Sequence, residues 1–389
     1  MSGFVPGNRI TLLRAGVEYF PALEAACDSA QHEIYLETYI FADDAAGQRV
    51  AAALSRAARR GVVVHVMIDG FGSRDLSDDF LRALQRDGVR VLKYRPQISP
   101  WTLRRERLRR LHRKIVVVDA RVAFVGGINI IDDMHTPNQV PPRFDYAVCV
   151  EGPLLAEIHR VAARLWTLVM WTQFRQRWQA SEIEVQAHAC GEQRAAFFVR
   201  DNLRHRNDIE SAYLDAIAQA TTEVVIANAY FFPGLSFRRA LADAAARGVR
   251  VVLLLLLQGR VEYVLLHYAS RALYGYFLEA GVEIYEYHRS FLHAKVAVID
   301  ERWATVGSSN IDPMSLLLAR EANVMIDDAG FARELRASLN DAMQLGAERV
   351  QRERWLRQSL PARIMTWICY ELVRFMTGWS SYGRAREFK

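Results

Sequence analysis

Hydrophobic and polar positions along this chain follow two alternating patterns. Short, mostly apolar runs such as Val62–Ile68 and Val249–Leu257 have the length and the β-branched content of buried strands. The stretch before each run has apolar residues at helical spacing and ends at a glycine, Gly61 or Gly248, the usual signal just beyond a helix C-terminus. Strands that alternate with helices predict an α/β fold in which helices cover a sheet.

This succession of elements occurs twice. The predicted strand at 33–41 corresponds to 223–231, and the Gly-Val segments at 88–94 and 281–287 correspond in the same way. A length of 389 residues also favours two units over one. We therefore expect two halves related by a pseudo-twofold axis and sharing one site, with a C-terminal segment after them, at residues 1–185, 186–345 and 346–389.

A polar signature of identical spacing closes the pattern in each half. It reads His-x-Lys, four residues, Asp, six residues, then Gly-x-x-Asn, and its members are His112, Lys114, Asp119 and Asn129, then His293, Lys295, Asp300 and Asn310. Each His and Lys are two positions apart in a predicted strand, so their side chains leave the same face. Imidazole, ammonium and carboxamide groups together suit nucleophilic attack on a phosphodiester. The signatures therefore predict phosphoryl chemistry at a shared cleft.

Composition narrows the choice of partner only slightly. Fifty Lys and Arg against 44 Asp and Glu give a formal charge of +6, which favours anionic partners without choosing among nucleic acid, anionic lipid and small phosphates. The most apolar run, Val251–Leu257, has seven residues, far fewer than the roughly 20 that cross a bilayer. The first ten residues lack the apolar core of a secretory signal. We expect neither a spanning helix nor a signal peptide.

The two signatures resemble those of the phospholipase D superfamily, and their surroundings resemble bacterial cardiolipin synthases, most of all the B type. The resemblance covers nearly the whole chain. It implies a duplicated phospholipase D-like α/β sandwich and a two-step phosphatidyl transfer that needs no metal or other cofactor. In that reaction a histidine attacks phosphatidylglycerol, glycerol leaves, and the hydroxyl of a second phospholipid takes the phosphatidyl group. The segments that carry the resemblance are 111–120, 125–129, 226–234 and 304–315.

The resemblance also implies roles for individual residues. His112 would be the nucleophile and His293 the general acid and then the base, although the pseudosymmetry leaves the reverse assignment open. Phosphate oxygens would be bound by Lys114, Lys295, Asn129 and Asn310.

Each catalytic imidazole is expected to need a carboxylate on its second nitrogen, which fixes the tautomer and supports the cationic form. The family pattern supplies Glu321 in the second half and Asp145 in the first. The signature aspartates, Asp119 and Asp300, belong to the catalytic motif but look structural by comparison.

The first half carries an insert, because Tyr94 lies 18 residues before His112 whereas Tyr287 lies six before His293. This segment could gather anionic headgroups at the mouth of the cleft, and a solvated basic loop is the alternative. Its basic and aromatic residues are Arg95, Trp101, Arg104, Arg105, Arg107, Arg109 and Arg110.

The segment 355–379 has the apolar spacing of an interfacial helix, and 158–178 has a similar character. Packing against the protein's own core is the alternative for both. We expect a peripheral enzyme of the bacterial inner membrane whose partners are anionic phospholipids such as phosphatidylglycerol, with no nucleic acid and an open oligomeric state. The apolar positions of the C-terminal stripe are Ile364, Ile368, Leu372, Phe375 and Trp379.

Two other functions stay open. One is hydrolysis of lipid or nucleic acid by an enzyme of the same superfamily, and the other is anion binding without catalysis. Two complete signatures count against the second, while the synthase-like surroundings and the aromatic C-terminal stripe count against the first.

Overall fold

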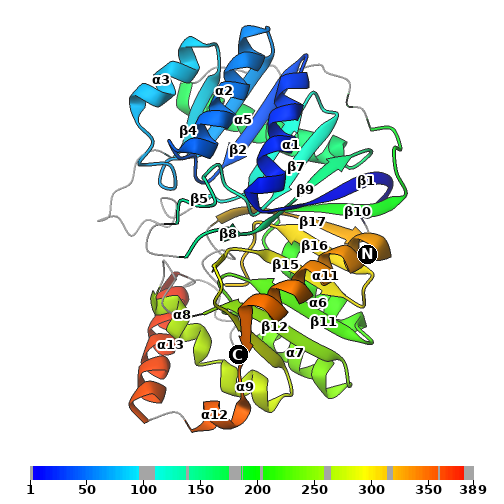
Figure 1. The fold of residues 1–389 in the computed structure, drawn as a ribbon, viewed down its shortest axis with the longest axis vertical. Helices are drawn as coiled ribbons and strands as arrows, with labels where there is room; N and C mark the ends of the chain where they lie inside the picture. Colours follow the sequence, from blue (N-terminus) through cyan, green and yellow to red (C-terminus); the bar gives the residue numbers. More distant parts are fainter. Residues whose placement is uncertain are drawn as a thin grey trace.

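The computed structural model describes residues 3–95, 110–136, 140–174, 185, 187–201, 205–257, 264–312, 319–357 and 360–380. Figure 1 shows two α/β units, one above the other, whose strands meet in the middle of the molecule. The upper unit is built from the first half of the chain and the lower one from the second.

The first half forms a sheet with helices on both of its faces. Its elements are β1 (Val5–Arg14), α1 (Ala15–Ser29), β2 (Glu33–Thr38), α2 (Ala45–Arg59), β3 (Val63–Asp69), α3 (Asp78–Arg86), β4 (Arg90–Tyr94), β5 (Arg110–Leu111), β6 (Lys114–Val118), β7 (Val122–Gly126), β8 (Arg143–Phe144), β9 (Tyr146–Glu151) and α5 (Leu155–Phe174).

The elements of the second half and of the segment after it are β10 (Gln193–Arg200), α6 (Asp208–Gln219), β11 (Glu223–Asn228), α7 (Leu235–Ala246), β12 (Arg250–Leu256), α8 (Val264–Arg271), α9 (Tyr274–Glu279), β13 (Glu283–Tyr287), β14 (Phe291–Leu292), β15 (Lys295–Ile299), β16 (Trp303–Gly307), β17 (Ala319–Asp327), α11 (Ala329–Gly346), β18 (Ala347–Arg349), α12 (Arg352–Leu356) and α13 (Leu360–Ser380). They follow the order of the first half, except that α8 and α9 stand in place of α3 and β17 in place of β8 and β9. The last three, β18, α12 and α13, come after the repeat.

The strand order confirms the duplicated α/β fold. One continuous sheet runs β18-β13-β12-β11-β15-β16-β17-β10-β1-β9-β7-β6-β2-β3-β4, and the antiparallel pair β1 and β10 joins its two parts. Counting outward from this pair, β9, β7, β6, β2, β3 and β4 match β17, β16, β15, β11, β12 and β13. The predicted ends of two helices are also confirmed. Gly61 and Gly248 follow α2 and α7 and have φ of 95° and 89°, as glycines just beyond a helix C-terminus often do.

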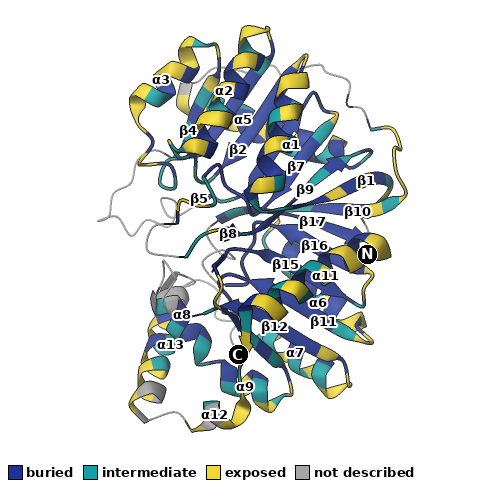
Figure 2. Cartoon of the chain, in the orientation of Figure 1, coloured by how far each residue is buried: buried dark blue, intermediate teal, exposed yellow. Residues whose placement is uncertain are grey.

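Three buried hydrophobic clusters lie within the described residues, and one of them is shared by the two halves. The cluster that contains Val117 and Val148 of the first half also contains Val298 and Val324 of the second, so the halves are packed as one body. Figure 2 shows buried strands beneath helices whose outer faces are exposed.

The α5 segment, for which core packing and lipid contact were both open, divides between the two. Ile158, Leu165 and Trp166 are buried in the shared core, whereas Leu168 and Trp171 are 46% and 53% exposed. Trp178 lies outside the described residues. Most of the apolar stripe is therefore core, as a stripe of this kind usually is.

A buried ion pair distinguishes the first half from the second. Arg113, between the signature His and Lys, points away from them and makes a two-pronged ion pair with Glu37 of β2, with 2.9 Å between Nη2 and Oε1. The equivalent positions in the second half are Ala294 and Ala227, both buried. The same strand pairing is thus built once with charges and once without them.

We predict that Glu37→Leu destabilises the protein by about 3–5 kcal/mol, because it leaves the Arg113 guanidinium buried without its carboxylate. The double variant Glu37→Leu/Arg113→Met removes both charges at similar volume and should lie close to the wild type in urea unfolding.

The matched control is Glu151→Leu, which breaks the exposed, two-pronged Arg9–Glu151 pair and should cost less than about 1 kcal/mol. If the two changes in the double variant simply added, the buried pair would not be coupled in this way.

Candidate active site

Two short pairs of parallel strands, called bridges below, each place one signature beside the opposite half. In the first, β5 pairs with β17, and the backbone N–H of His112 donates to the carbonyl of Arg320 at 3.0 Å. In the second, β14 pairs with β8, and the N–H of His293 donates to the carbonyl of Phe144 at 2.8 Å. The residue after each carbonyl is a carboxylate, Glu321 or Asp145. The bridges therefore set each histidine beside a carboxylate of the other half.

The histidines and carboxylates are paired crosswise. Nδ1 of His112 lies 2.8 Å from Oε1 of Glu321, and Nδ1 of His293 lies 2.6 Å from Oδ2 of Asp145. The sequence places one carboxylate in each half, and the structure gives each histidine the carboxylate of the opposite half. Because Nδ1 is engaged in both rings, Nε2 is the nitrogen left for chemistry. The side chains of His112 and His293 are 17% and 10% exposed.

Both signature lysines are buried beside their histidines. Lys114 Nζ donates to the carbonyl of His112 at 2.6 Å. Lys295 Nζ donates to the carbonyl of His293 and lies 2.7 Å from its Nδ1 and 3.8 Å from Asp145 Oδ2. Burial, with Lys295 nearby, lowers the pKa of Lys114 to about 7 against the attraction of Glu321.

The electrostatics of the site favour an anion. Burial and the neighbouring ammonium groups lower the pKa of His112 and that of His293, although Glu321 partly offsets the shift at His112. Burial raises the pKa of Asp145 to about 6, with Lys295 acting in the opposite direction. Both imidazoles are therefore neutral in the free site, and a bound negative charge would favour protonation of one of them.

The two signature asparagines lie just beyond the ends of β7 and β16 and are buried. Asn129 Oδ1 accepts the backbone N–H of Ile40 at 3.1 Å, which leaves its Nδ2 as the donor. Tyr39, the residue before Ile40, has its ring centroid 4.9 Å from that of His112. Asn310 occupies the equivalent place in the second half.

The halves differ beside their carboxylates. A Cβ at Gly127 would lie 2.3 Å from Oδ1 of Asp145, so only glycine leaves room for that carboxylate. At the equivalent position Ser308 donates its hydroxyl to Glu321 Oε2 at 2.5 Å. Sequence reasoning missed this serine. The signal for it was the change from Gly-Gly to Gly-Ser between the two copies.

The structure does not bring the signature aspartates into the site. Asp119 accepts the N–H groups of residues 31–33 at 2.8–2.9 Å, and Asp300 accepts those of 221–223 in the same way. Each lies past a five-residue strand, ~16 Å from the signature lysine. Burial alone would raise the pKa of Asp300, but the backbone hydrogen bonds lower it to about 2. These carboxylates hold the starts of β2 and β11.

Two buried arginines near the catalytic pairs were also missed. Arg143 lies two positions before Asp145, and its charge contributes to the lowered pKa of His293. Arg200 of β10 stands opposite Glu321 in the sheet, and burial lowers its pKa to about 10 although Glu321 raises it. Only the pairing of β10 with β17 reveals the second of these residues.

Most of the basic insert, residues 96–109, lies outside the described part of the chain. Trp101 and the arginines at 104, 105, 107 and 109 lie outside the described residues. Arg110 belongs to β5, with its guanidinium 5.1 Å from the ring of Phe71. The next residue, Leu111, donates its backbone N–H to the buried Asp69 at 2.8 Å. Within the described part of the chain, no three His, Cys, Asp or Glu residues are grouped as a metal site.

Comparison with a family model and with individual proteins identifies the same family. The family described as "Cardiolipin synthase, PLD-like domain" matches residues 23–166 and 213–343, one segment around each signature. The cardiolipin synthases B of Shigella flexneri and of Escherichia coli strain K12 are each 43% identical over 344 residues, 88% of this chain and 82% of theirs. The crystal structure of phosphatidylserine synthase from Haemophilus influenzae Rd KW20 has a TM-score of 0.72 at 14% identity and covers 96% of both chains, which shows a shared fold.

We predict a narrow pH optimum for kcat/KM with a phosphodiester substrate. The rate should fall as pH drops through about 6, where Asp145 becomes protonated, and as pH rises through about 7, where the free enzyme loses the Lys114 ammonium. In Lys114→Arg the alkaline limb should move up by at least about one pH unit, because the guanidinium stays charged.

The matched control is Lys93→Arg, which changes a lysine outside the site and should leave the profile unchanged. An alkaline limb that stays in place in Lys114→Arg would show that another group controls it.

Proposed function

Because this chain belongs to the cardiolipin synthase family with phospholipase D-like domains, we propose that it is a phosphatidyltransferase that makes cardiolipin. It transfers the phosphatidyl group of one phosphatidylglycerol to the hydroxyl of a second and releases glycerol. The observation that carries this proposal is the crosswise pairing of two complete signatures in one buried site.

In the first step Nε2 of His112 attacks the phosphorus of phosphatidylglycerol. The nitrogen–phosphorus bond forms, the bond to the glycerol oxygen breaks, and His293 gives that oxygen its proton. The bound phosphodiester brings a negative charge next to the buried imidazoles, which raises the pKa of His293 above its value in the free site. The greater exposure of His112 supports its role as the nucleophile.

In the second step His293, now neutral, takes the proton from the hydroxyl of the acceptor lipid. The acceptor oxygen attacks the phosphorus, the bond to His112 breaks, and cardiolipin leaves. Ammonium and amide donors stabilise the charge that develops on the non-bridging oxygens in both steps. These donors are Lys114, Lys295, Asn129 and Asn310.

The C-terminal helix α13 supports binding to a membrane surface. It turns Cys369 and Val373 inward, and Tyr370 packs 5.5 Å from the ring of Phe232. Apolar side chains over the rest of the helix surface are 45–67% exposed: Ile364, Met365, Trp367, Ile368, Leu372 and Phe375. The side chain of Trp379 is outside the described set.

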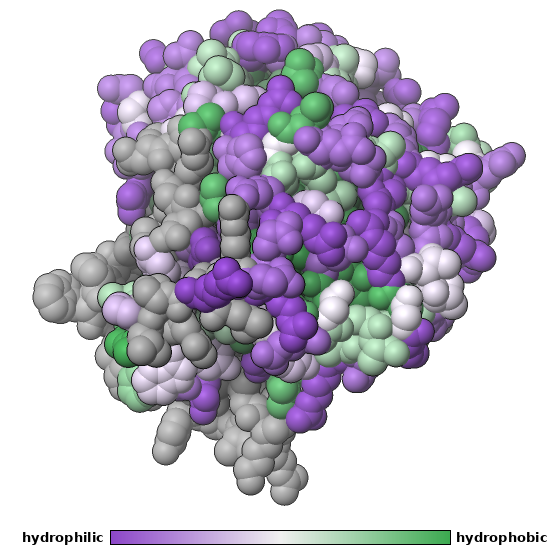
Figure 3. All heavy atoms as spheres, turned by 60° about the horizontal axis from the view of Figure 1, so that its bottom comes forward, coloured by the Kyte–Doolittle hydropathy of each residue, from purple (hydrophilic) through white to green (hydrophobic). Residues whose placement is uncertain are grey.

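Figure 3, in which the lower end of Figure 1 comes forward, shows hydrophobic patches among hydrophilic side chains on that end. None of the helices in the described chain has the length and apolarity that a membrane span requires. An exposed apolar face of this kind suits a helix that lies in the lipid headgroup region. We infer peripheral attachment to the bacterial inner membrane through α13, where anionic phospholipids are the substrate.

The purified protein should convert phosphatidylglycerol vesicles to cardiolipin and glycerol in equal amounts, with and without chelator. His112→Ala should lower this rate by about 1,000-fold or more, whereas His32→Ala, at an exposed histidine, should not. Lipid mass spectrometry measures the products. Phosphatidic acid as the only product would indicate a hydrolase, and no lipid turnover would direct attention to nucleic acid.

The same reaction tests the two histidine roles. With a phosphatidyl p-nitrophenyl ester, whose leaving group departs without a proton, His293→Ala should accumulate a phosphatidyl group on the peptide that contains His112, because the nucleophile remains while the base for the second step is gone. Peptide mass spectrometry detects it. Modification of His293 in His112→Ala would reverse the assignment.

Replacing Trp367 and Phe375 by Asp should weaken binding to phosphatidylglycerol vesicles by about tenfold or more, since each buried aromatic side chain contributes about 1.5–3 kcal/mol. Vesicle sedimentation measures this. The matched control is Leu345→Asp on α11, an equally exposed apolar residue. Equal losses in both variants would show that α13 is not the membrane contact.

A further inference from the structure

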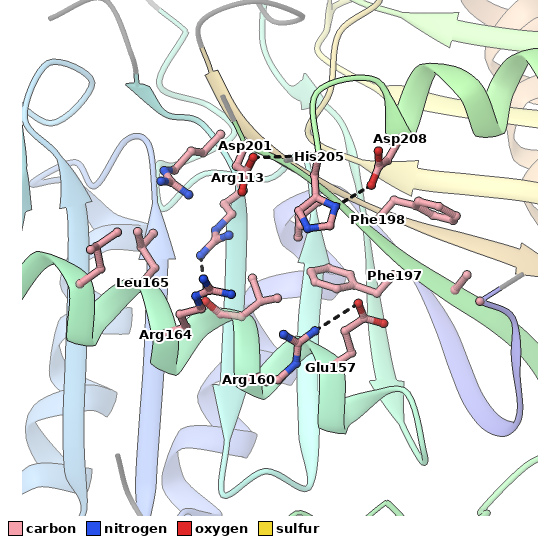
Figure 4. Close-up of a pocket in the computed structure, with 16 residues that line it drawn as sticks. Arg113, Glu157, Arg160, Arg164, Leu165, Phe197, Phe198, Asp201, His205 and Asp208 are labelled. Atoms are coloured by element: carbon pink, nitrogen blue, oxygen red, sulfur yellow. Dashed lines mark hydrogen bonds and ion pairs between the residues drawn. The ribbon is translucent and has the colours of Figure 1, made fainter. Parts of the chain in front are cut away.

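A cavity lies behind the catalytic strands. Its volume is about 360 Å³, and it opens between α5 and the strands β10 and β17. Two of its lining residues are Arg113 and Arg320, the neighbours of His112 and Glu321. Successive side chains in extended backbone leave opposite faces, so this cavity is on the far side of the strands from the His112–Glu321 pair. Figure 4 shows Arg113 pointing toward α5, where it donates to the carbonyl of Val161 at 3.4 Å.

The walls of this rear cavity combine apolar and cationic surface. Val161, Leu165 and Leu168 of α5 face it together with Phe197 and Val199 of β10. Its volume is within the range of small-molecule sites, roughly 300–1,000 Å³. The apolar wall therefore suits a hydrocarbon chain.

Several charges in the rear cavity compensate one another. Arg160 lies 3.6 Å from Glu157 on α5, and His205 Nδ1 lies 2.7 Å from Asp208, as the dashed lines in Figure 4 show. Arg113 is already paired with Glu37 on its other side. The other charged lining residues are Arg164, Arg320 and Asp201, whose Oδ1 accepts the backbone N–H of His205 at 3.1 Å (Figure 4).

Two guanidinium groups are left over. Within the described residues, neither Arg164 nor Arg320 has a carboxylate at ion-pair distance, and Arg320 Nε donates only to the hydroxyl of Tyr94 at 3.2 Å. Guanidinium groups beside apolar surface bind phosphate well, because their planar fork matches two phosphate oxygens. Arg164 is exposed and Arg320 is half-buried, so both guanidinium groups are accessible to an anion that enters with a ligand.

We propose that the rear cavity binds an amphiphile with a phosphate headgroup. Its phosphate lies at Arg164 and Arg320, and its alkyl chain runs along Leu165, Leu168 and Phe197. The same phosphate chemistry is offered by a lipid headgroup and by free inorganic phosphate, and the alkyl chain separates the two sources.

A ligand in the rear cavity would also affect the His112–Glu321 pair, because Arg320 contacts both the cavity and the backbone of His112. The carbonyl of Arg320 accepts the N–H of His112, and Glu321 is the next residue. A ligand that fixes Arg320 restrains the β5–β17 bridge and with it the His112–Glu321 contact, so it raises the transfer rate. This step rests on the proposed function, whereas binding itself does not.

Binding is tested by titrating the full-length protein with octyl phosphate, inorganic phosphate and octyl glucoside in a calorimeter. Octyl phosphate should bind more tightly than either of the others, and Arg164→Gln and Leu168→Asn should each raise its Kd by about tenfold. Arg86→Gln, at an exposed arginine of α3, is the matched control and should not.

Equal binding of inorganic phosphate, or of octyl glucoside, would overturn the amphiphile site. So would an octyl phosphate Kd unchanged in Arg164→Gln, because binding would then lie elsewhere.

The coupling is tested by the rate of cardiolipin formation. Octyl phosphate should raise kcat/KM of the wild type by about twofold or more and that of Arg164→Gln by clearly less, each protein being compared with its own rate before octyl phosphate is added. An equal response of the two proteins would overturn the coupling. Absence of cardiolipin in every sample would instead overturn the proposed function and leave the calorimetric result standing.

Discussion

The site depends on two β-bridges of two residues each. β5 pairs with β17 and β14 with β8, and each bridge ends where a histidine meets the carboxylate of the other half. Neither half holds a complete histidine–carboxylate pair by itself. The central pair of β1 and β10 and the shared hydrophobic core fix the position of the halves, and so the bridges can form. Stability of the junction and assembly of the site are therefore the same physical requirement.

Burial of so many charges is costly unless they compensate one another. Here the ammonium groups of Lys114 and Lys295 lie beside the carboxylates of Asp145 and Glu321, and two buried guanidinium groups, those of Arg143 and Arg200, give the site an excess of positive charge. Burial moves the pKa of Lys114 down to about 7 and that of Asp145 up to about 6. Such a site is polarised before substrate arrives, and a phosphodiester supplies the negative charge that both lysines favour. Preorganised charge of this kind stabilises a developing phosphorane better than water does, because no solvent has to reorganise.

The repeated pattern was sufficient to predict the duplicated fold, and strand alternation placed each His and Lys on one face. It could not predict the crosswise pairing. Sequence spacing places one carboxylate in each half, but it does not show which histidine each carboxylate contacts once the halves pack together. Arg200 was missed for the same reason, since its place depends on the register between β10 and β17. In α5 the apolar spacing was real, but only packing separates buried Trp166 from exposed Trp171.

The two halves differ at several residues that contact the catalytic groups or their neighbours in the strands. Alanines occupy the positions of Arg113 and Glu37 in the second copy. Where Gly127 makes room for Asp145, the second copy has Ser308, whose hydroxyl donates to Glu321. A symmetric site would give both imidazoles the same proton affinity, and neither would be favoured as the acid. Burial and the neighbouring cations Lys295 and Arg143 lower the pKa of His293 well below its usual value. Burial also lowers the pKa of His112, but Glu321 offsets part of that shift, so the two imidazoles have unequal proton affinities in the free site.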